Sequence, residues 1–381
     1  MKRFLVITMA LMLVVGSLAG CGGGEQAADD KSEIALITDK GNIDDRSFNQ
    51  GAWEGVVEYA EANDISHTYI KPEEASDAGY LAAIDLAVQG GAEIVVTPGF
   101  LFEVPIYEAQ TKYPDVKFIL LDGSPHTADW STFETKENVA SIMYAEEESG
   151  FLAGYAAVKD GMTDLGFMGG MAVPAVQAFG YGYLQGAEYA AMEMGLEDNA
   201  VEVTYHYTGN FEENDTNKAT AKTMYQEGVE VIFACGGSVG KSVMSAAAED
   251  EAKVIGVDVD QRYDSETVIT SAMKGLSESV VSVLESIYND NFDQYSGKTT
   301  YFAAANDGVG LPTEVIGEED ADAFDRFEKF TKEEYDAIFG ELADGNLDVT
   351  RTIEVEAETG YATAEELTEQ LDLQKVSVTT R

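Results

Sequence analysis

The stretch IALITDKGNIDDRSFNQGAWEG, residues 34–55, contains the structural unit from which the chain is built. Its apolar start predicts a buried strand over Ile34–Thr38. A polar loop follows, and the apolar spacing from Ser47 to Ala62 predicts an amphipathic helix. A strand, a polar loop and a helix in this order are typical of βα units around a parallel sheet.

The same alternation recurs in two series of similar length along the chain. The first predicts strands at 67–70, 94–97, 117–121 and 138–144, with helices at 80–89 and 104–112. The second predicts helices at 150–158, 176–194, 217–226 and 242–249, with strands at 165–168, 201–207, 229–234 and 254–257. We therefore expect an α/β protein of two doubly wound lobes joined by a hinge. Ligands of such sheets bind beyond the carboxyl ends of the strands, here in a cleft between the lobes.

The expected division of the chain follows from these two series. Residues 33–145 and about 268–305 are assigned to the N-terminal lobe, and residues 146–267 and about 306–360 to the C-terminal lobe. Within the latter, helical patterns cover 318–330 and 332–342, and VTRTIEV (349–355) reads as an edge strand. Residues 361–381 are expected to form an acidic tail with an exposed helix at 363–373.

The N-terminus has the features of a targeting segment. Lys2 and Arg3 precede an apolar run, Phe4–Val15, which is shorter than the roughly 20 residues that a membrane-spanning helix needs. The following Leu18-Ala19-Gly20-Cys21 resembles a bacterial lipobox, which predicts cleavage after residue 20 and lipidation of Cys21. Residues 21–32 would form a flexible tether. The protein is thus expected on the extracytoplasmic face of the cell membrane; an ordinary signal peptide that contains a cysteine is the alternative.

Composition excludes several classes of function. The chain has 23 Lys+Arg against 70 Asp+Glu, a formal net charge of −47, which repels nucleic acid and anionic lipid. An apolar content of 45% excludes a disordered acidic protein. Three His and two Cys leave little for a metal site or a disulfide framework, so no metal or cofactor is expected. Adaptation to a salty habitat is one hypothesis for the acidity.

Two polar loops carry an aromatic residue each. The first, Asp39–Gln50, follows the first strand and contains Phe48, while Asp45 or Ser47 caps the helix. The second, Thr208–Asp215, contains Phe211 at the corresponding place in the second series. Two aromatics from opposite lobes could enclose a planar ring, although either could instead pack into a core, and sugars also stack on aromatics.

Further candidates lie at other strand ends. Asp122 in FILLDG and Asp258 in VIGVD could accept hydrogen bonds from a ligand, Asp258 from a vicinal diol, or could be surface turn residues. The loop Gly236–Lys241 lacks the spacing of a phosphate-binding loop, and its glycines, such as Gly237, let backbone N–H groups approach a ligand. Catalytic signatures are missing, and Cys235 ends an apolar strand.

These segments together resemble the basic membrane protein (BMP) family of lipoproteins, receptors for purine nucleosides that serve ABC importers. The resemblance rests on seven segments in the family's order: residues 38–55, 118–123, 138–157, 165–186, 207–221, 234–240 and 254–261. It implies a two-lobed, type I periplasmic-binding-protein fold, a purine nucleoside as ligand and permease subunits as partners. We expect a monomer that contacts the membrane only through its lipid.

The resemblance also implies roles for single residues. Phe48 and Phe211 would enclose the purine, while Asp39, Asn49 and Asp122 would read its edge. Asp258 and Lys241 would hold the ribose hydroxyls. Arg46 stands where the family usually has Lys.

Three alternatives to a nucleoside receptor stay open. The first is a receptor of the same fold for a sugar or another small solute. The second, from another class, is an extracellular nucleoside hydrolase with Asp39, Asp44 and Asp45 on a metal. The third is an adhesive or structural surface protein, for which the sequence has no repeat signature.

Overall fold

A computed structural model describes residues 32–318 and 321–381 of the chain. The predicted signal peptide, the lipidation site Cys21 and the tether up to residue 31 lie outside the described residues. In the part of the chain that the structure describes, none of the helices has the length and apolar character needed to cross a membrane.

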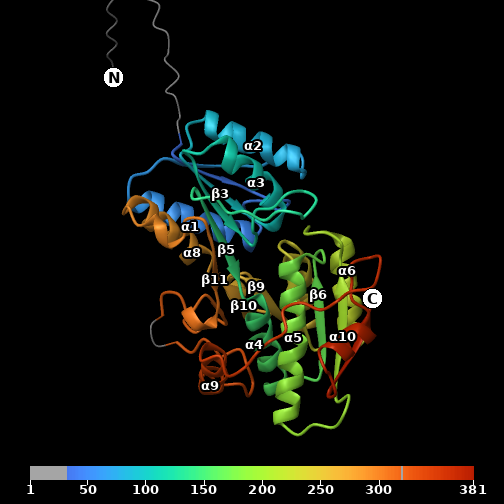
Figure 1. The fold of residues 1–381 in the computed structure, drawn as a ribbon. Helices are drawn as coiled ribbons and strands as arrows, with labels where there is room; N and C mark the ends of the chain where they lie inside the picture. Colours follow the sequence, from blue (N-terminus) through green and yellow to red (C-terminus); the bar gives the residue numbers. More distant parts are fainter. Residues whose placement is uncertain (1–31, 319–320) are drawn as a thin grey trace, which may run out of the picture. The chain divides into compact units, whose positions relative to one another are not determined.

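The first lobe is built on a six-stranded parallel sheet of order β11-β5-β4-β3-β1-β2 (Figure 1). Its strands are β1 (Ile34–Ile37), β2 (His67–Ile70), β3 (Ile94–Pro98), β4 (Lys117–Leu121), β5 (Val139–Tyr144) and β11 (Lys298–Phe302). Helices α1 (Phe48–Ala62) and α8 (Leu276–Tyr288) pack together on one face, and α2 (Asp77–Gln89) and α3 (Glu103–Lys112) on the other. All residues of β1 are buried because helices cover both faces of the sheet.

The second lobe is built on a seven-stranded sheet of order β12-β10-β9-β8-β6-β7-β13. Its strands are β6 (Asp164–Gly169), β7 (Val201–Tyr207), β8 (Val231–Cys235), β9 (Lys253–Asp258), β10 (Val268–Lys274), β12 (Val309–Gly310) and β13 (Val376–Thr380). Its helices form two packed pairs, α4 (Glu146–Lys159) with α5 (Pro174–Glu193) and α6 (Asp215–Gln226) with α7 (Val239–Asp250). Helices α4 and α5 can lie in close contact because Gly154 has no side chain. A Cβ atom at this position would meet the Tyr183 carbonyl oxygen at 2.0 Å.

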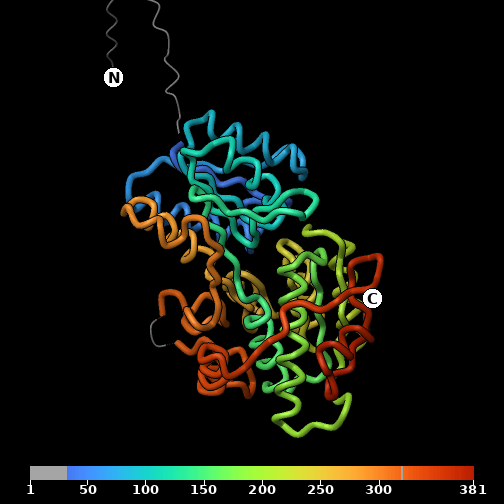
Figure 2. Tube along the Cα trace, in the orientation of Figure 1, coloured from blue at the N-terminus to red at the C-terminus, as the bar shows by residue number. Residues whose placement is uncertain are grey.

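The chain passes between the lobes three times, as the tube in Figure 2 traces. The first crossover lies between β5 and α4, the second between β10 and α8, and the third between β11 and β12. The crossovers are hydrogen-bonded to one another: the Ala145 N–H donates to the Phe302 carbonyl (2.9 Å) and the Gly275 N–H to the Gly308 carbonyl (2.9 Å). Together they form the hinge.

The expected chain division differs from the structure at residue 268. Strand β10 was assigned to the first lobe, but it pairs with β9 in parallel register and belongs to the second sheet. The crossing back comes only at Gly275, after which α8 packs on α1.

The C-terminal part of the chain follows the second lobe. It contains the helices α9 (Lys332–Ala343) and α10 (Ala364–Gln370). Other parts of the chain contain short 3-10 helices at Phe100–Phe102, Gln261–Tyr263, Phe292–Gln294 and Ala304–Asn306. The helix expected at 318–330 is wrong for the residues described there, which form turns. The helix expected at 363–373 is present as α10, whereas the residues after it, expected as part of an acidic tail, form the edge strand β13, which pairs with β7.

The edge strand expected at 349–355 is also wrong. Side chains satisfy the backbone there: the Glu354 N–H donates to Gln370 Oε1 (2.7 Å), and Gln370 Nε2 donates to the Glu354 carbonyl (2.6 Å). Strand-like alternation of residues therefore does not lead to sheet pairing at this place.

Candidate functional site

A cavity of about 190 Å³ lies between the lobes, at the carboxyl ends of strands from both sheets. Its wall combines carboxylates, one buried lysine, glycines and several aromatic rings. Among the lining residues are Asp39, Phe48, Asn49, Phe100, Asp122, Met171, Phe179, Phe211, Gly237, Asp258 and Lys274. Ligand sites of drug-sized molecules are larger, roughly 300–1,000 Å³. The cavity therefore suits a small molecule.

The loop between β1 and α1 is held by its own carboxylates. Asp45 accepts hydrogen bonds from the backbone N–H groups of Ser47 (2.9 Å), Asn49 (3.1 Å) and Gln50 (3.1 Å) and so satisfies the start of the helix. Asp39 accepts from the Gly41 N–H (2.8 Å) and from Asn49 Nδ2 (2.9 Å). Burial raises the pKa of Asp39 to about 6.

A buried lysine forms the charged centre of the cavity. Lys274 Nζ lies 2.6 Å from Asp122 Oδ2, 3.1 Å from Glu146 Oε1 and 3.9 Å from Asp258 Oδ1, and its side chain is 2% exposed. Although burial opposes its charge, these carboxylates raise its pKa above the ordinary value. The ammonium also lies 4.7 Å from the centre of the Phe48 ring, within the range of a cation–π contact.

Asp122 and Asp258 occupy matching positions in the two lobes. Asp122 directly follows β4, Asp258 ends β9, and both have left-handed backbone conformations, with φ of 55° and 69°. The Ser47 hydroxyl donates to Asp258 Oδ2, whereas Asp122 Oδ1 is buried and has no hydrogen-bond partner among the described residues. Burial raises the pKa of both carboxyls although Lys274 opposes the shift. A free buried acceptor is costly, so Asp122 is suited to accept a hydrogen bond from a ligand.

The aromatic rings enter the cavity from both lobes. Phe48 is the first residue of α1, Phe179 lies on α5, and Phe211 lies in the loop after β7. The Phe211 ring packs against the backbone of Gly170, where a side chain would meet the ring carbons at 2.5 Å. Gly237, with φ of 56°, lies near Phe211 and leaves that side of the wall without a side chain.

Lys241 is placed differently from the other expected residues. It does not line the cavity but a wider polar depression beside it, whose walls include Asp39, Lys40 and Phe211 as well. Its Nζ donates to the Asp44 carbonyl (2.9 Å), which joins the lobes at the rim of the cleft. An ion pair between Arg46 and Asp264 also joins the lobes.

The acidic residues considered for a metal-dependent hydrolase have other roles in the described part of the chain. Among residues 32–318 and 321–381, no group of three or more His, Cys, Asp or Glu could hold a metal ion. The side chains of Asp39 and Asp45 are occupied within their own loop, and Asp44 is exposed. Cys235 lines the cavity but is buried, and burial raises the pKa of its thiol, so a reactive thiolate is disfavoured.

Sequence reasoning missed Lys274, Phe179 and Glu146. Lys274 is the last residue of the strand VITSAMK, just as Asp258 is the last residue of its own strand. In a sequence, a lysine at the end of a strand is usually interpreted as a solvent-exposed residue. Only the folded chain shows that three carboxylates surround Lys274.

Comparisons with known proteins agree with the two-lobed fold. A family model described as Bmp, ABC transporter substrate-binding protein PnrA-like, matches residues 31–344. The ABC transporter nucleoside-binding protein BmpA of Lactococcus lactis subsp. cremoris is 29% identical over 350 residues, which cover 84% of this chain and 94% of the relative. An uncharacterized lipoprotein of Pyrococcus furiosus is 27% identical, covering 81% and 77%. An ABC transporter solute-binding protein of Aeropyrum pernix has a similar fold, with a TM-score of 0.75, 24% identity, and coverage of 90% of this chain and 99% of its own.

Proposed function

Because the chain belongs to the Bmp family of PnrA-like ABC transporter substrate-binding proteins, we propose that its substrate is a nucleoside, and specifically a purine nucleoside. The chain is a two-lobed binding protein and not an enzyme. One relative is named a nucleoside-binding protein. The observation that carries the proposal is that Phe48 and Phe211, one from each lobe, line one cavity beside Asp122 and Asp258.

The lining of this cavity, with a phenyl ring from each lobe and carboxylates beside them, supports a flat ligand with a polar attachment. A purine base between two phenyl rings gains stacking energy of roughly 1–3 kcal/mol per base. The carboxylate of Asp258 suits the adjacent hydroxyls of a ribose, since each carboxylate oxygen can accept more than one hydrogen bond.

The charges around the cavity support a nucleoside over a nucleotide. Asp39, Asp45, Asp122 and Asp258 line it, against the cations Lys40 and Lys274. Lys274 is already engaged by carboxylates, so a phosphate would enter a site of excess negative charge. Neutral N–H and O–H donors match such a wall, and the unpartnered Asp122 Oδ1 adds a free acceptor.

The cellular setting completes the proposal. Lipid on Cys21 would hold the folded body on the outer face of the membrane, where a monomer would pass its nucleoside to permease subunits of an ABC importer. The name of the Pyrococcus furiosus relative, a lipoprotein, supports this placement.

Titration calorimetry with inosine, guanosine and adenosine tests the proposal. Binding of at least one of them, with ribose, galactose and the matching 5′-monophosphates inactive, is the expected result. Mass spectrometry of small molecules that co-purify with the protein provides an independent readout. Binding of ribose or galactose without any nucleoside would instead favour a sugar receptor, and release of free base would revive a hydrolase.

A further inference from the structure

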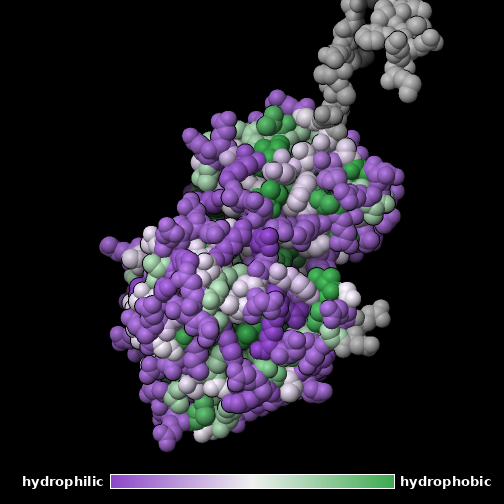
Figure 3. All heavy atoms as spheres, turned by 180° about the vertical axis from the view of Figure 1, so that it is seen from behind, coloured by the Kyte–Doolittle hydropathy of each residue, from purple (hydrophilic) through white to green (hydrophobic). Residues whose placement is uncertain are grey.

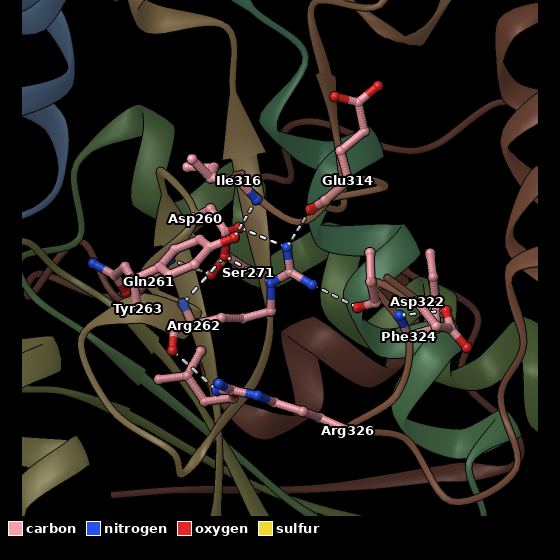
Figure 4. Close-up of polar contacts among 12 residues, drawn as sticks. Asp260, Gln261, Arg262, Tyr263, Ser271, Glu314, Ile316, Asp322, Phe324 and Arg326 are labelled. Atoms are coloured by element: carbon pink, nitrogen blue, oxygen red, sulfur yellow. Dashed lines mark hydrogen bonds and ion pairs between the residues drawn. The ribbon is translucent and has the colours of Figure 1, made fainter. Parts of the chain in front are cut away.

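The family match ends at residue 344, and the remaining residues are here called the C-terminal segment (345–381). This segment passes the first crossover at Arg351 and later forms β13 at the edge of the second sheet. The stretch that leads to it is firmly anchored. The Arg262 guanidinium donates to the carbonyls of Ala323 (2.6 Å) and Glu314 (2.7 Å), and Arg326 donates to the Arg262 carbonyl (3.0 Å; Figure 4). These contacts tie Glu314, Ala323 and Arg326, which precede the C-terminal segment, to the second lobe.

A reciprocal pair of hydrogen bonds fixes the segment beside the hinge. Gln185 on α5 donates to the Thr350 carbonyl (2.9 Å), and the Thr350 N–H donates to Gln185 Oε1 (2.8 Å). The next residue, Arg351, then reaches the first crossover, where its Nη1 donates to the Tyr144 carbonyl (2.8 Å). Arg351 is thus positioned by the preceding residue, Thr350, which is bound to α5.

Arg351 and Lys274 bind different oxygens of the same carboxylate. Arg351 Nη1 lies 2.5 Å from Glu146 Oε2, and Lys274 Nζ lies 3.1 Å from Glu146 Oε1. Glu146 is fully buried, at 0% exposure, and it does not line the cavity. Arg351 is also 2.5 Å from Glu147 Oε2.

We propose that Arg351 is a positioning residue for ligand binding, which holds Glu146 so that the Lys274 ammonium stays at the cavity wall beside Asp122. The inference rests on the proposed function only in using a nucleoside as probe. It assigns a role in the substrate site to a segment outside the family match.

The balance of buried charge explains the role. Lys274 alone would face the three carboxylates of Asp122, Glu146 and Asp258. Arg351 supplies a second cation, which pairs with the other carboxylate oxygen of Glu146. Without it, the uncompensated Glu146 would draw Lys274 towards itself and away from Asp122, because a buried carboxylate is strongly stabilised by the remaining cation.

Variants at Arg351 test the inference by calorimetry with inosine. Arg351→Gln should weaken inosine binding about tenfold, the lower end of what outer-shell partners contribute at metal sites. Arg351→Lys, which keeps the charge, should restore most of the affinity. Arg381→Gln removes another arginine of the same segment, paired with Glu227 at the surface, and should leave affinity unchanged. Unchanged affinity in Arg351→Gln, or equal losses in Arg351→Gln and Arg351→Lys, would overturn the inference.

A second comparison separates positioning from a general structural effect. In the Glu146→Gln background, Arg351→Gln should have little further effect on inosine binding, because the Glu146 carboxylate that links Arg351 to Lys274 is gone. Full additivity of the two losses would contradict the proposed route through Glu146.

Crystal structures of the unliganded Arg351→Gln and Arg381→Gln variants give a readout that does not depend on the ligand. In Arg351→Gln, Lys274 should lose its 2.6 Å contact with Asp122 and turn towards Glu146. An unmoved Lys274 would overturn the inference. If the wild-type protein binds no nucleoside, the proposed function fails, and these structures still decide the role of Arg351.

Discussion

Lys274 and Asp122 form an ion pair with an N–O distance of 2.6 Å that joins the two lobes at the cavity wall. Lys274 is the last residue of β10 in the second sheet, and Asp122 directly follows β4 in the first. Their side chains are only 2% and 9% exposed. Since neither charge is well solvated, each depends on its partner, and the pair couples the position of the lobes to the electrostatics of the cavity.

Replacement of Lys274 by Met should destabilise the fold strongly. It leaves Asp122, Glu146 and Asp258 without their shared cation, and breaking a buried ion pair costs about 3–5 kcal/mol. Urea denaturation at neutral pH measures the loss, and Asp122→Asn in the same chain should recover part of it.

Lys112→Met is the matched control. Lys112 pairs with Asp85 at a similar N–O distance, 2.7 Å, but the two side chains are 50% and 32% exposed. The cost of Lys112→Met should be much smaller, because an exposed ion pair is well solvated and contributes little to stability. Similar losses for the two lysine variants would show that burial of the Lys274 network contributes nothing special.

Removal of either cavity phenyl ring should weaken nucleoside binding. Phe48→Ala and Phe211→Ala should each cost about 1–3 kcal/mol of inosine binding energy, the range for stacking of one base on an aromatic ring. Calorimetry measures the loss, and Phe133→Ala, at an exposed ring outside the cavity wall, serves as control. Full affinity in both cavity variants would contradict a base held between these rings.

Asp258→Ala should weaken inosine binding more than binding of 2′-deoxyinosine, since the deoxynucleoside lacks one hydroxyl donor to the carboxylate. Competition calorimetry with the two ligands gives the difference directly. Ser47→Ala removes the protein hydroxyl that donates to Asp258 but keeps the carboxylate, so it should not change the ratio of the two affinities. If Asp258→Ala weakens the binding of inosine and of 2′-deoxyinosine by the same factor, Asp258 does not bind the 2′-hydroxyl.

The sequence predicted most of the fold because strand and helix patterns are local. Strands His67–Ile70, Lys117–Leu121 and Val201–Tyr207 have the predicted bounds. What failed depends on distant partners. Whether Val268–Lys274 joins the first or second sheet is decided by its pairing with β9, and nothing within the strand itself encodes that choice.

The candidate site divides in the same way. Asp39, Phe48, Asp122, Phe211 and Asp258 could be selected because polar or aromatic residues at strand ends are visible in the sequence, and the structure brings these five to one cavity. Their roles towards a ligand stay predictions. The network behind them was hidden, because it is assembled from β10, the start of α4 and a residue near the C-terminus.

The stability contributed by Asp39 should fall as pH rises. Its folded-state pKa, raised by burial to about 6, lies above the ordinary value of 3.8, so the folded state binds the proton more tightly. Its contribution is therefore fully present below pH 3.8 and is lost as pH rises through 6. The difference in unfolding free energy between wild type and Asp39→Asn should decrease from pH 4 to pH 7, in urea titrations at about one-unit steps. Asp115→Asn, at an exposed carboxylate, is the control, and a difference that grows with pH would contradict the shift.

Added salt should stabilise the whole protein. The formal charge is −47, and the face in Figure 3 is covered mainly by hydrophilic residues, so like charges repel across the folded surface. Salt shortens the Debye length from about 10 Å at 0.1 M to about 3 Å at 1 M, which screens this repulsion. The thermal midpoint should therefore rise with NaCl and level off near 1 M. Sucrose acts by exclusion from the protein surface and not by screening, so a midpoint that rises with sucrose but not with NaCl would contradict an electrostatic origin.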